Sequence, residues 1–226
     1  MKNSALLLID FQQEDGSGHP SMTHIAGIGM DKIVENAQLL IEQARVQDIP
    51  IIYTRQINRA DGRGLVNREP VDATGSPIYY REGTAAVEIV EKIRPRPGDI
   101  VIDKRRQNAF YESELDMVLR GLGVSHLIVC GVTTDCCVFC TVQGAFDRSY
   151  AMTLIHDACG TTSVGGHMAA MMIMANWVYD LEIASTKGWL AQQRGAESRT
   201  WKSKTFDEFA FTPENMSRKY STIDEL

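Results

Sequence analysis

The chain has 226 residues, of which 44% are hydrophobic and 23% are charged, and its formal net charge at pH 7 is −6. This length accommodates a single α/β domain, and the composition is that of an ordinary globular protein. The negative charge, with lysine and arginine scattered along the chain, argues against a surface for nucleic acid or anionic membranes.

Membrane insertion and disulfide bonds are not indicated by the sequence. No apolar stretch approaches the roughly 20 residues that a transmembrane helix needs. The first residues lead directly into a strand-like segment and lack the pattern of a signal peptide. Five cysteines are an odd number, and three of them fall within residues 136–140. We therefore expect reduced thiols in a cytoplasmic protein.

The first half of the chain alternates between strand-like and helical patterns. Residues 5–9 form a continuous apolar run, which is typical of a strand buried on both faces. Apolar residues recur at helical spacing over 31–47, and residues 49–54 have the composition of a second strand. The polar, glycine-rich passage 56–83 has no clear period, and loops of this length usually line a site or cover it.

The second half repeats this alternation. Helical segments are predicted over residues 85–93, 112–122, 136–148 and 167–179. Strands are predicted over residues 99–103, 126–130, 151–155 and 181–184. Such an order predicts a three-layer α-β-α, Rossmann-like fold, with a six-stranded parallel sheet and helices on both faces.

The last part of the chain departs from this order. We expect residues 1–186 to form the α/β domain and residues 187–226 to form a C-terminal arm. The arm contains the aromatic residues Trp189, Trp201, Phe206, Phe209 and Phe211. Isolated aromatic side chains need a surface to bury against, so the arm should pack on the core or on a neighbouring subunit.

Three chemically active side chains stand at the ends of predicted strands. Asp10 ends the first strand, Lys104 follows the third, and Cys137 lies just after the fourth. Because the carboxyl ends of parallel strands meet at one edge of a sheet, these groups should share a crevice. A carboxylate can take the proton of a thiol, and a nearby ammonium lowers the pKa of the thiol.

The stretch 131–141 (GVTTDCCVFCT) joins the fourth strand to a predicted helix. Backbone N–H groups at a helix N-terminus favour anions, so a cysteine there should lose its proton more readily. The same donors can stabilise the oxyanion of a carbonyl under attack. Cys137 and Cys140 also have the Cys-x-x-Cys spacing of thiol redox sites, but such sites need neither Asp10 nor Lys104.

Over about residues 4–184, the chain resembles the isochorismatase-like cysteine hydrolases. The motifs that carry the resemblance are LIDFQ at residues 8–12, Asp103-Lys104 with Phe110, and GVTT at 131–134 with Cys137, Val138 and Thr141. The resemblance implies that Asp10 is a general base, that Lys104 supports it, and that Cys137 attacks a carbonyl carbon. It also implies a cis peptide between Val132 and Thr133, with the N–H groups of Thr133 and Cys137 aimed at the oxyanion.

Two departures narrow the function that the resemblance implies. Isochorismatases act without a cysteine nucleophile, so Cys137 argues against that reaction. Nicotinamidases of this group carry an Asp-x-His metal motif after the second strand, whereas residues 55–69 contain no histidine. We therefore expect no metal and no cofactor. The remaining branch hydrolyses N-carbamoyl and ureido compounds and maleamate-like amides.

We expect a hydrolase that cleaves a C–N bond of a small linear amide or an N-carbamoyl/ureido compound and releases ammonia. The alternatives are a nicotinamidase-like or other amide hydrolase of the same family, a catalytically silent binding member, and a thiol redox protein. Family members of this kind form homo-dimers or homo-tetramers. Substrate contacts are expected from Phe11, Gln12, Gln107, Asn108, Phe110 and Thr162.

Overall fold

The computed structural model describes residues 3–13, 25–205 and 207–226, and in these ranges one sheet organises the chain. Its seven strands run in the order β3-β2-β1-β4-β5-β6-β7. The strands are β1 (Ser4–Ile9), β2 (Ile51–Gln56), β3 (Ile100–Lys104), β4 (His126–Val132), β5 (Ala151–Gly160), β6 (Glu182–Ala184) and β7 (Trp201–Lys202). The first six are parallel, and β7 is antiparallel to β6.

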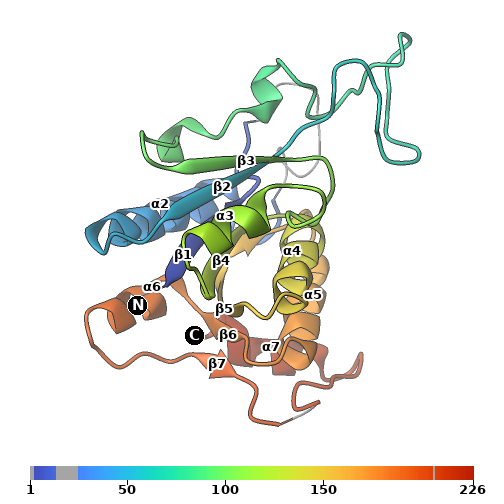
Figure 1. The fold of residues 1–226 in the computed structure, drawn as a ribbon. Helices are drawn as coiled ribbons and strands as arrows, with labels where there is room; N and C mark the ends of the chain where they lie inside the picture. Colours follow the sequence, from blue (N-terminus) through green and yellow to red (C-terminus); the bar gives the residue numbers. More distant parts are fainter. Residues whose placement is uncertain (1–2, 14–24, 206) are drawn as a thin grey trace.

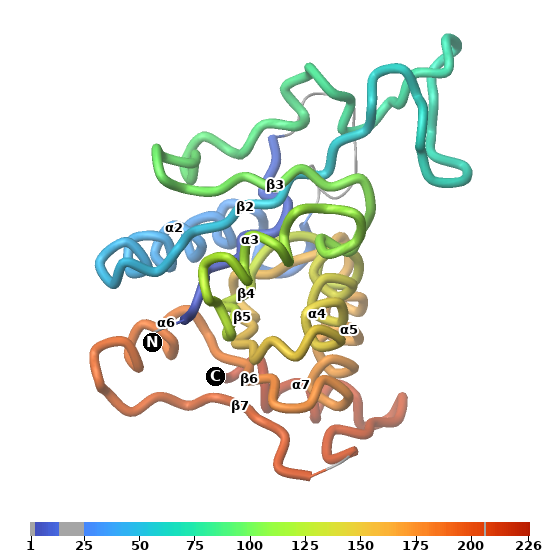
Figure 2. The backbone as a smooth tube through the Cα atoms, in the orientation of Figure 1, coloured from blue at the N-terminus to red at the C-terminus, as the bar shows by residue number. Residues whose placement is uncertain are grey.

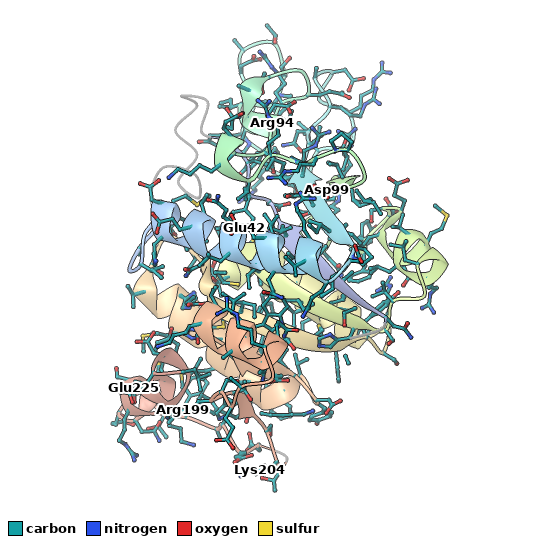
Figure 3. The ribbon with its side chains drawn as sticks, turned by 90° about the vertical axis from the view of Figure 1, so that its left-hand side faces the viewer. Glu42, Arg94, Asp99, Arg199, Lys204 and Glu225 are labelled. Carbon is teal, nitrogen blue, oxygen red and sulfur yellow. The ribbon has the colours of Figure 1, made fainter. Side chains whose placement is uncertain are left out.

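Helices cover both faces of the sheet. They are α2 (Met30–Val46), α3 (Leu115–Gly121), α4 (Phe139–Phe146), α5 (Val164–Trp177), α6 (Thr186–Gln193) and α7 (Met216–Asp224). Figure 1 shows α2 and α6 on one side of the sheet and α4 and α5 on the other. Figure 3, viewed from the side of α2, shows this helix crossing in front of the strands, with Glu42 on it. This three-layer arrangement confirms the predicted α/β fold, with a seventh strand added at one edge.

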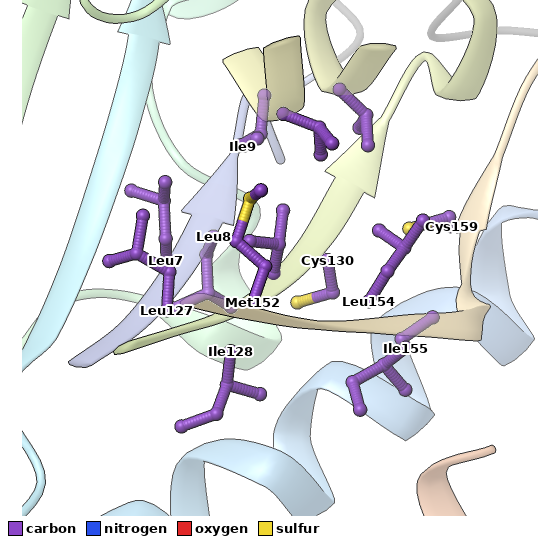
Figure 4. Close-up of a cluster of buried hydrophobic side chains, with 14 of the residues drawn as sticks. Leu7, Leu8, Ile9, Leu127, Ile128, Cys130, Met152, Leu154, Ile155 and Cys159 are labelled. Carbon is purple, nitrogen blue, oxygen red and sulfur yellow. The ribbon is translucent and has the colours of Figure 1, made fainter. Parts of the chain in front are cut away.

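The core lies where the central strands meet the helices (Figure 4). All six residues of β1 are buried because the strand has a neighbour on each side and a helical layer on each face. This environment explains its unbroken apolar run. Strand β4, which pairs with β1, and strand β5, which pairs with β4, contribute Leu127, Ile128, Cys130, Met152, Leu154, Ile155 and Cys159 to the same cluster.

The segment between β2 and β3 has little regular structure. Figures 1 and 2 show it extending beyond the sheet on the β3 side. The prediction of a helix over residues 85–93 is wrong. Only two short 3₁₀ turns form there, η1 (Ala85–Val87) and η2 (Glu91–Ile93). The residues between them are extended, since Gln12 and Ile89 form an antiparallel bridge and Val90 N–H donates to the Phe11 carbonyl at 2.9 Å.

The C-terminal segment packs on the rest of the chain. Trp189 and Phe209 are buried, and the Phe209 ring contacts Trp201 edge to face at 4.9 Å between centroids. Helix α7 packs against α5 and β5 and buries Ile223. Phe206 lies outside the described residues. Contact of this segment with a neighbouring subunit stays a prediction.

No helix in the described part of the chain is long and apolar enough to cross a membrane.

Helix α7 contacts a partly buried histidine near the carboxyl end of the sheet. The rings of Tyr220 on α7 and His167 on α5 meet edge to face, with centroids 6.1 Å apart. His167 Nδ1 is hydrogen-bonded to Thr134 Oγ1 at 2.8 Å. Burial, together with the neighbouring His156, lowers the pKa of His167 to about 4, so the ring is neutral at pH 7.

Gly131 brings β4 unusually close to β1. Its φ is 142°, and a Cβ built on it would lie 2.2 Å from the Ile9 carbonyl oxygen. Any side chain at this position must push apart two central strands immediately before the turn that carries Cys137.

Replacing Gly131 by alanine should therefore destabilise the protein by about 3 kcal/mol, from backbone strain and overpacking together. Urea denaturation followed by circular dichroism measures this loss. Gly121→Ala is the matched control, because nothing lies within 4 Å of the added Cβ and alanine favours the helix. Equal denaturation midpoints for Gly131→Ala and the wild type would contradict this account of the β1–β4 contact.

The depressed pKa of His167 predicts acid sensitivity. Between pH 6.5 and 4 the unfolded chain binds a proton that the folded state does not, so the free energy of unfolding falls as the pH decreases. The expected loss over this window is about 3 kcal/mol. His167→Asn cannot titrate there, so its urea midpoint should change less between pH 7 and 4 than that of the wild type. Parallel pH profiles for the two proteins would refute this assignment.

Candidate active site

The ends of three strands bring the predicted reactive groups together. Asp10 follows β1, Lys104 ends β3, and Cys137 lies in the π-helical turn η3 (Thr134–Val138) after β4. Asp10 has φ 53°, and its N–H donates to the Thr54 carbonyl on β2 at 3.2 Å. Thr54 Oγ1 donates to Asp10 Oδ1 at 2.7 Å, so β2 fixes the orientation of the carboxylate.

A buried ion pair lies at the centre of the site. Lys104 Nζ is 2.8 Å from Asp10 Oδ2, and the two side chains are 0% and 7% exposed. The ammonium also donates to Gln56 Oε1 at 2.9 Å and to the Arg106 carbonyl at 3.0 Å. Cys137 Sγ lies 3.4 Å from the same nitrogen. A charge that is buried away from water needs polar partners in the protein. The Lys104 ammonium has four of them.

These surroundings keep Lys104 charged. Burial alone lowers the pKa of Lys104, but the Asp10 carboxylate and Cys137 outweigh it and raise the pKa above its ordinary value. Lys104 therefore keeps its positive charge at neutral pH.

The thiol of Cys137 is protonated in the resting site, contrary to the prediction of a lowered pKa. A hydrogen bond with the Cys136 side chain, burial, and the Asp10 carboxylate raise the pKa of Cys137 well above its ordinary value. The Lys104 ammonium lowers it, but is outweighed. Cys137 must therefore lose its proton during the reaction. The Asp10 carboxylate, which contacts the same Lys104 ammonium, is placed to receive this proton.

The turn that carries Cys137 is held from several sides. The peptide bond between Val132 and Thr133 is cis. Val138 N–H donates to the Thr133 carbonyl at 3.1 Å, which closes the wide π-helical turn. Thr161 Oγ1 donates to Asp135 Oδ1 at 2.6 Å, and His167 is hydrogen-bonded to Thr134, so the residue that follows β5 and helix α5 both fix the turn.

A cavity of about 520 Å³ opens over these groups. It is lined by Asp10, Gln56, Asn58, Val66, Glu69, Tyr80, Arg105, Arg106, Gln107, Asn108, Tyr111, Val132, Thr133, Cys136, Cys137 and Cys140. Residues 58, 66, 69 and 80 belong to the irregular segment after β2, which confirms that this long passage lines a site.

Two of the six predicted substrate contacts line the cavity, namely Gln107 and Asn108. Phe11 is fully buried in the core. Phe110 stacks on Tyr150, with centroids 5.8 Å apart, and therefore packs beneath the site. Thr162 is exposed and lies outside the lining.

Gln12, also predicted as a contact, braces the site from behind. Its Nε2 donates to the Gln56 carbonyl at 3.0 Å and to the Ala86 carbonyl at 3.1 Å, and its Oε1 accepts from Gln56 N–H at 2.8 Å. With both polar atoms occupied, Gln12 positions the end of β2 instead of facing the cavity.

Thr54 and Gln56 were missed by the sequence analysis, and the contact of His167 with Thr134 was not foreseen. Thr54 and Gln56 lie at the end of β2, between the strands of Asp10 and Lys104, so the strand-end rule already contained the signal for them. His167 gives no such signal, because its contact with Thr134 depends on how α5 packs.

The other cysteines do not change this picture. All five thiols are free, and Cys130 and Cys159 are buried in the core. Cys140 lies on the cavity wall and donates to Gln107 Oε1 at 3.6 Å. Within the described ranges, no group of three or more His, Cys, Asp or Glu side chains is arranged to hold a metal ion. The expectation of a metal-free site stays a prediction.

Known proteins share this sequence pattern and fold. Residues 4–183 match the isochorismatase domain family. The chain is 30% identical over 172 residues to a ureidoacrylate amidohydrolase RutB of Caulobacter segnis, covering 70% of this chain and 72% of the relative. An uncharacterized isochorismatase family protein of Bacillus subtilis, YddQ, is 28% identical over 162 residues, covering 71% and 79%.

Solved structures show the same fold at lower identity. An isochorismatase family protein from Desulfovibrio vulgaris superposes with a TM-score of 0.74 and 24% identity, covering 86% of this chain and 100% of its own. N-carbamoylsarcosine amidase from Thermoplasma acidophilum gives 0.65 and 24%, covering 82% and 97%. The matched domain spans β1 to β6 and includes all three strand-end residues of the site, so this chain belongs to the isochorismatase family of cysteine hydrolases.

Proposed function

We propose that this chain hydrolyses a C–N bond of a small linear amide or an N-carbamoyl/ureido compound, with Cys137 as nucleophile and ammonia as a product. One observation carries the proposal: Lys104 Nζ contacts both Asp10 Oδ2, at 2.8 Å, and Cys137 Sγ, at 3.4 Å, at the floor of the cavity. A carboxylate base and a thiol that contact the same ammonium are an arrangement suited to acyl transfer. The names of the ureidoacrylate and N-carbamoylsarcosine relatives support the same substrate class.

The first step forms a carbon–sulfur bond. Asp10 accepts the Sγ proton as sulfur attacks the carbonyl carbon, and the C=O electron pair moves onto oxygen. We assign the N–H groups of Thr133 and Cys137 to this oxyanion, since both residues line the cavity, Thr133 just before the turn and Cys137 within it. The Lys104 ammonium stabilises the negative charge as it moves between carboxylate and sulfur.

The next steps break two bonds and regenerate the thiol. The tetrahedral intermediate collapses, the C–N bond breaks, and the nitrogen takes the proton from Asp10 and leaves as ammonia. A water molecule then attacks the acyl carbon through its oxygen, and Asp10 takes a proton from this water. The C–S bond breaks, the sulfur recovers its proton from Asp10, and the acid leaves (for a ureido substrate, a carbamic acid).

Replacing Cys137 by alanine should lower the rate of ammonia release by at least about 10⁴-fold, because the covalent step is lost. The assay is ammonia release from primary amides, N-carbamoyl amino acids, biuret and ureidoacrylate. Cys140→Ala is the matched control, a thiol of the same wall that takes no part in the proposed steps, and its rate should stay within about tenfold.

Near-normal turnover by Cys137→Ala would refute the mechanism. A loss of function in Cys140→Ala, with a disulfide between residues 137 and 140, would instead favour the redox alternative. Ammonia from nicotinamide alone would favour the nicotinamidase-like alternative.

Replacing Asp10 by asparagine tests the base separately. The amide has the shape of the carboxylate and can still accept from Thr54, but it cannot take the thiol proton. We expect kcat to fall by about 10³-fold, in the range usual for loss of a general base. Thr54→Val keeps the carboxylate and removes only its orienting hydrogen bond, so its loss should be much smaller. Equal losses in the two variants would mean that Asp10 acts only through packing.

A further inference from the structure

We propose that Arg105 and Arg106 form an anion subsite beside Cys137, and that the substrate is therefore an acid: an amide, carbamoyl or ureido compound that carries a carboxylate. The inference rests on the proposed function for the reacting carbon. The subsite itself rests on the charges and hydrogen bonds of the cavity wall.

Among the residues that the structure describes, the two guanidinium groups have no carboxylate partner. Both line the cavity, and in the described part of the chain neither lies within 4 Å of a carboxylate oxygen. Arg55, at the same end of the sheet, is paired with Asp103 at 2.8 Å. Partly buried cations without an anion gain strongly from a ligand that supplies one.

Backbone carbonyls orient both side chains. Arg105 Nη1 donates to the Ile57 carbonyl at 3.0 Å. Arg106 Nη1 donates to the Gly64 carbonyl at 3.0 Å and to the Arg105 carbonyl at 2.7 Å. A guanidinium has five N–H donors, so these contacts hold it in place and leave further donors for a planar carboxylate.

The subsite is linked to the reacting groups through Lys104. The Arg106 carbonyl accepts from Lys104 Nζ at 3.0 Å, and the same nitrogen contacts Cys137 Sγ at 3.4 Å. The Arg106 backbone is thus next to the nucleophile, and its side chain extends to Gly64 in the wall formed by the segment after β2. This arrangement suits a short substrate whose carboxylate lies a few bonds from the attacked carbon.

One carboxylate opposes the two arginines on the wall. Glu69 lines the cavity, and its Oε1 accepts from Asn58 Nδ2 at 2.9 Å. Asp10 is neutralised by Lys104. The described wall therefore carries a net positive charge, although the whole chain is negative. The electrostatic potential inside the cavity acts on a bound ligand, whereas the net charge of the whole chain says little about which ligand the cavity prefers.

The kinetic test compares N-carbamoylglycine with its uncharged methyl ester. Wild-type kcat/KM should favour the acid by at least about tenfold, the worth of one charge-assisted contact. Arg106→Gln should raise KM for the acid by at least about tenfold and change KM for the ester little. Glu69→Gln is the matched control, a neutralised wall charge of opposite sign, and should not raise KM for the acid. An ester preferred by the wild type, or an unchanged KM for the acid in both Arg105→Gln and Arg106→Gln, would overturn the proposal.

A binding test separates the subsite from the reaction. Isothermal titration of Cys137→Ala with succinate and with neutral succinamide requires no turnover. Succinate should bind more tightly, and adding Arg106→Gln should remove that preference. If no substrate yields ammonia but this preference is observed, the proposed function fails and the subsite stands. If the two ligands bind equally to Cys137→Ala, the subsite fails whatever the turnover.

Arg106→Lys covers the case in which Arg106→Gln does not fold. It keeps the charge but lacks the planar fork, so succinate binding to Cys137→Ala should weaken at least about threefold while succinamide binding stays the same. Unchanged succinate binding in this variant and in Arg105→Lys would count against recognition by guanidinium.

Discussion

The ion pair between Lys104 and Asp10 constrains the rest of the site. Lys104 ends β3 and Asp10 follows β1, and because these two strands are not neighbours the contact spans the end of β2. Burying two charges is favourable only when their remaining hydrogen-bonding groups find partners. Thr54 and Gln56 of β2 are these partners. The register of three strands is therefore tied to the chemistry at their ends. A shift of any one strand would leave a buried charge without a partner.

The parallel sheet and its reactive edge are predictable because their signals are local. An apolar run such as residues 5–9 indicates a buried strand, and the rule for strand ends brings Asp10, Lys104 and Cys137 to one edge. What escapes prediction depends on pairing between distant segments. Strand β7 exists only because Trp201 and Lys202 meet β6, and residues 88–90 are extended because they meet residues 11–13. No periodicity within those segments encodes such contacts.

The fine structure of the site escapes prediction for a related reason. A residue next to a strand end faces either the cavity or the core, and sequence alone does not distinguish the two. Gln12 and Phe110 belong to the motifs yet pack behind the cavity, whereas Arg105 and Arg106 line it. The pKa of Cys137 is a second example. A helix terminus and a lysine predict a lowered pKa, but the hydrogen bond with Cys136, burial and the nearby carboxylate raise it.

The position of α7 has a consequence for what counts as the catalytic unit. The family match ends at residue 183, near the end of β6, but contacts continue from Tyr220 through His167 to Thr134, in the turn of the nucleophile. The C-terminal helix is thus part of the support of the active site. Two relatives that align well over the shared domain can therefore differ in reactivity because their tails differ, with every reactive residue intact.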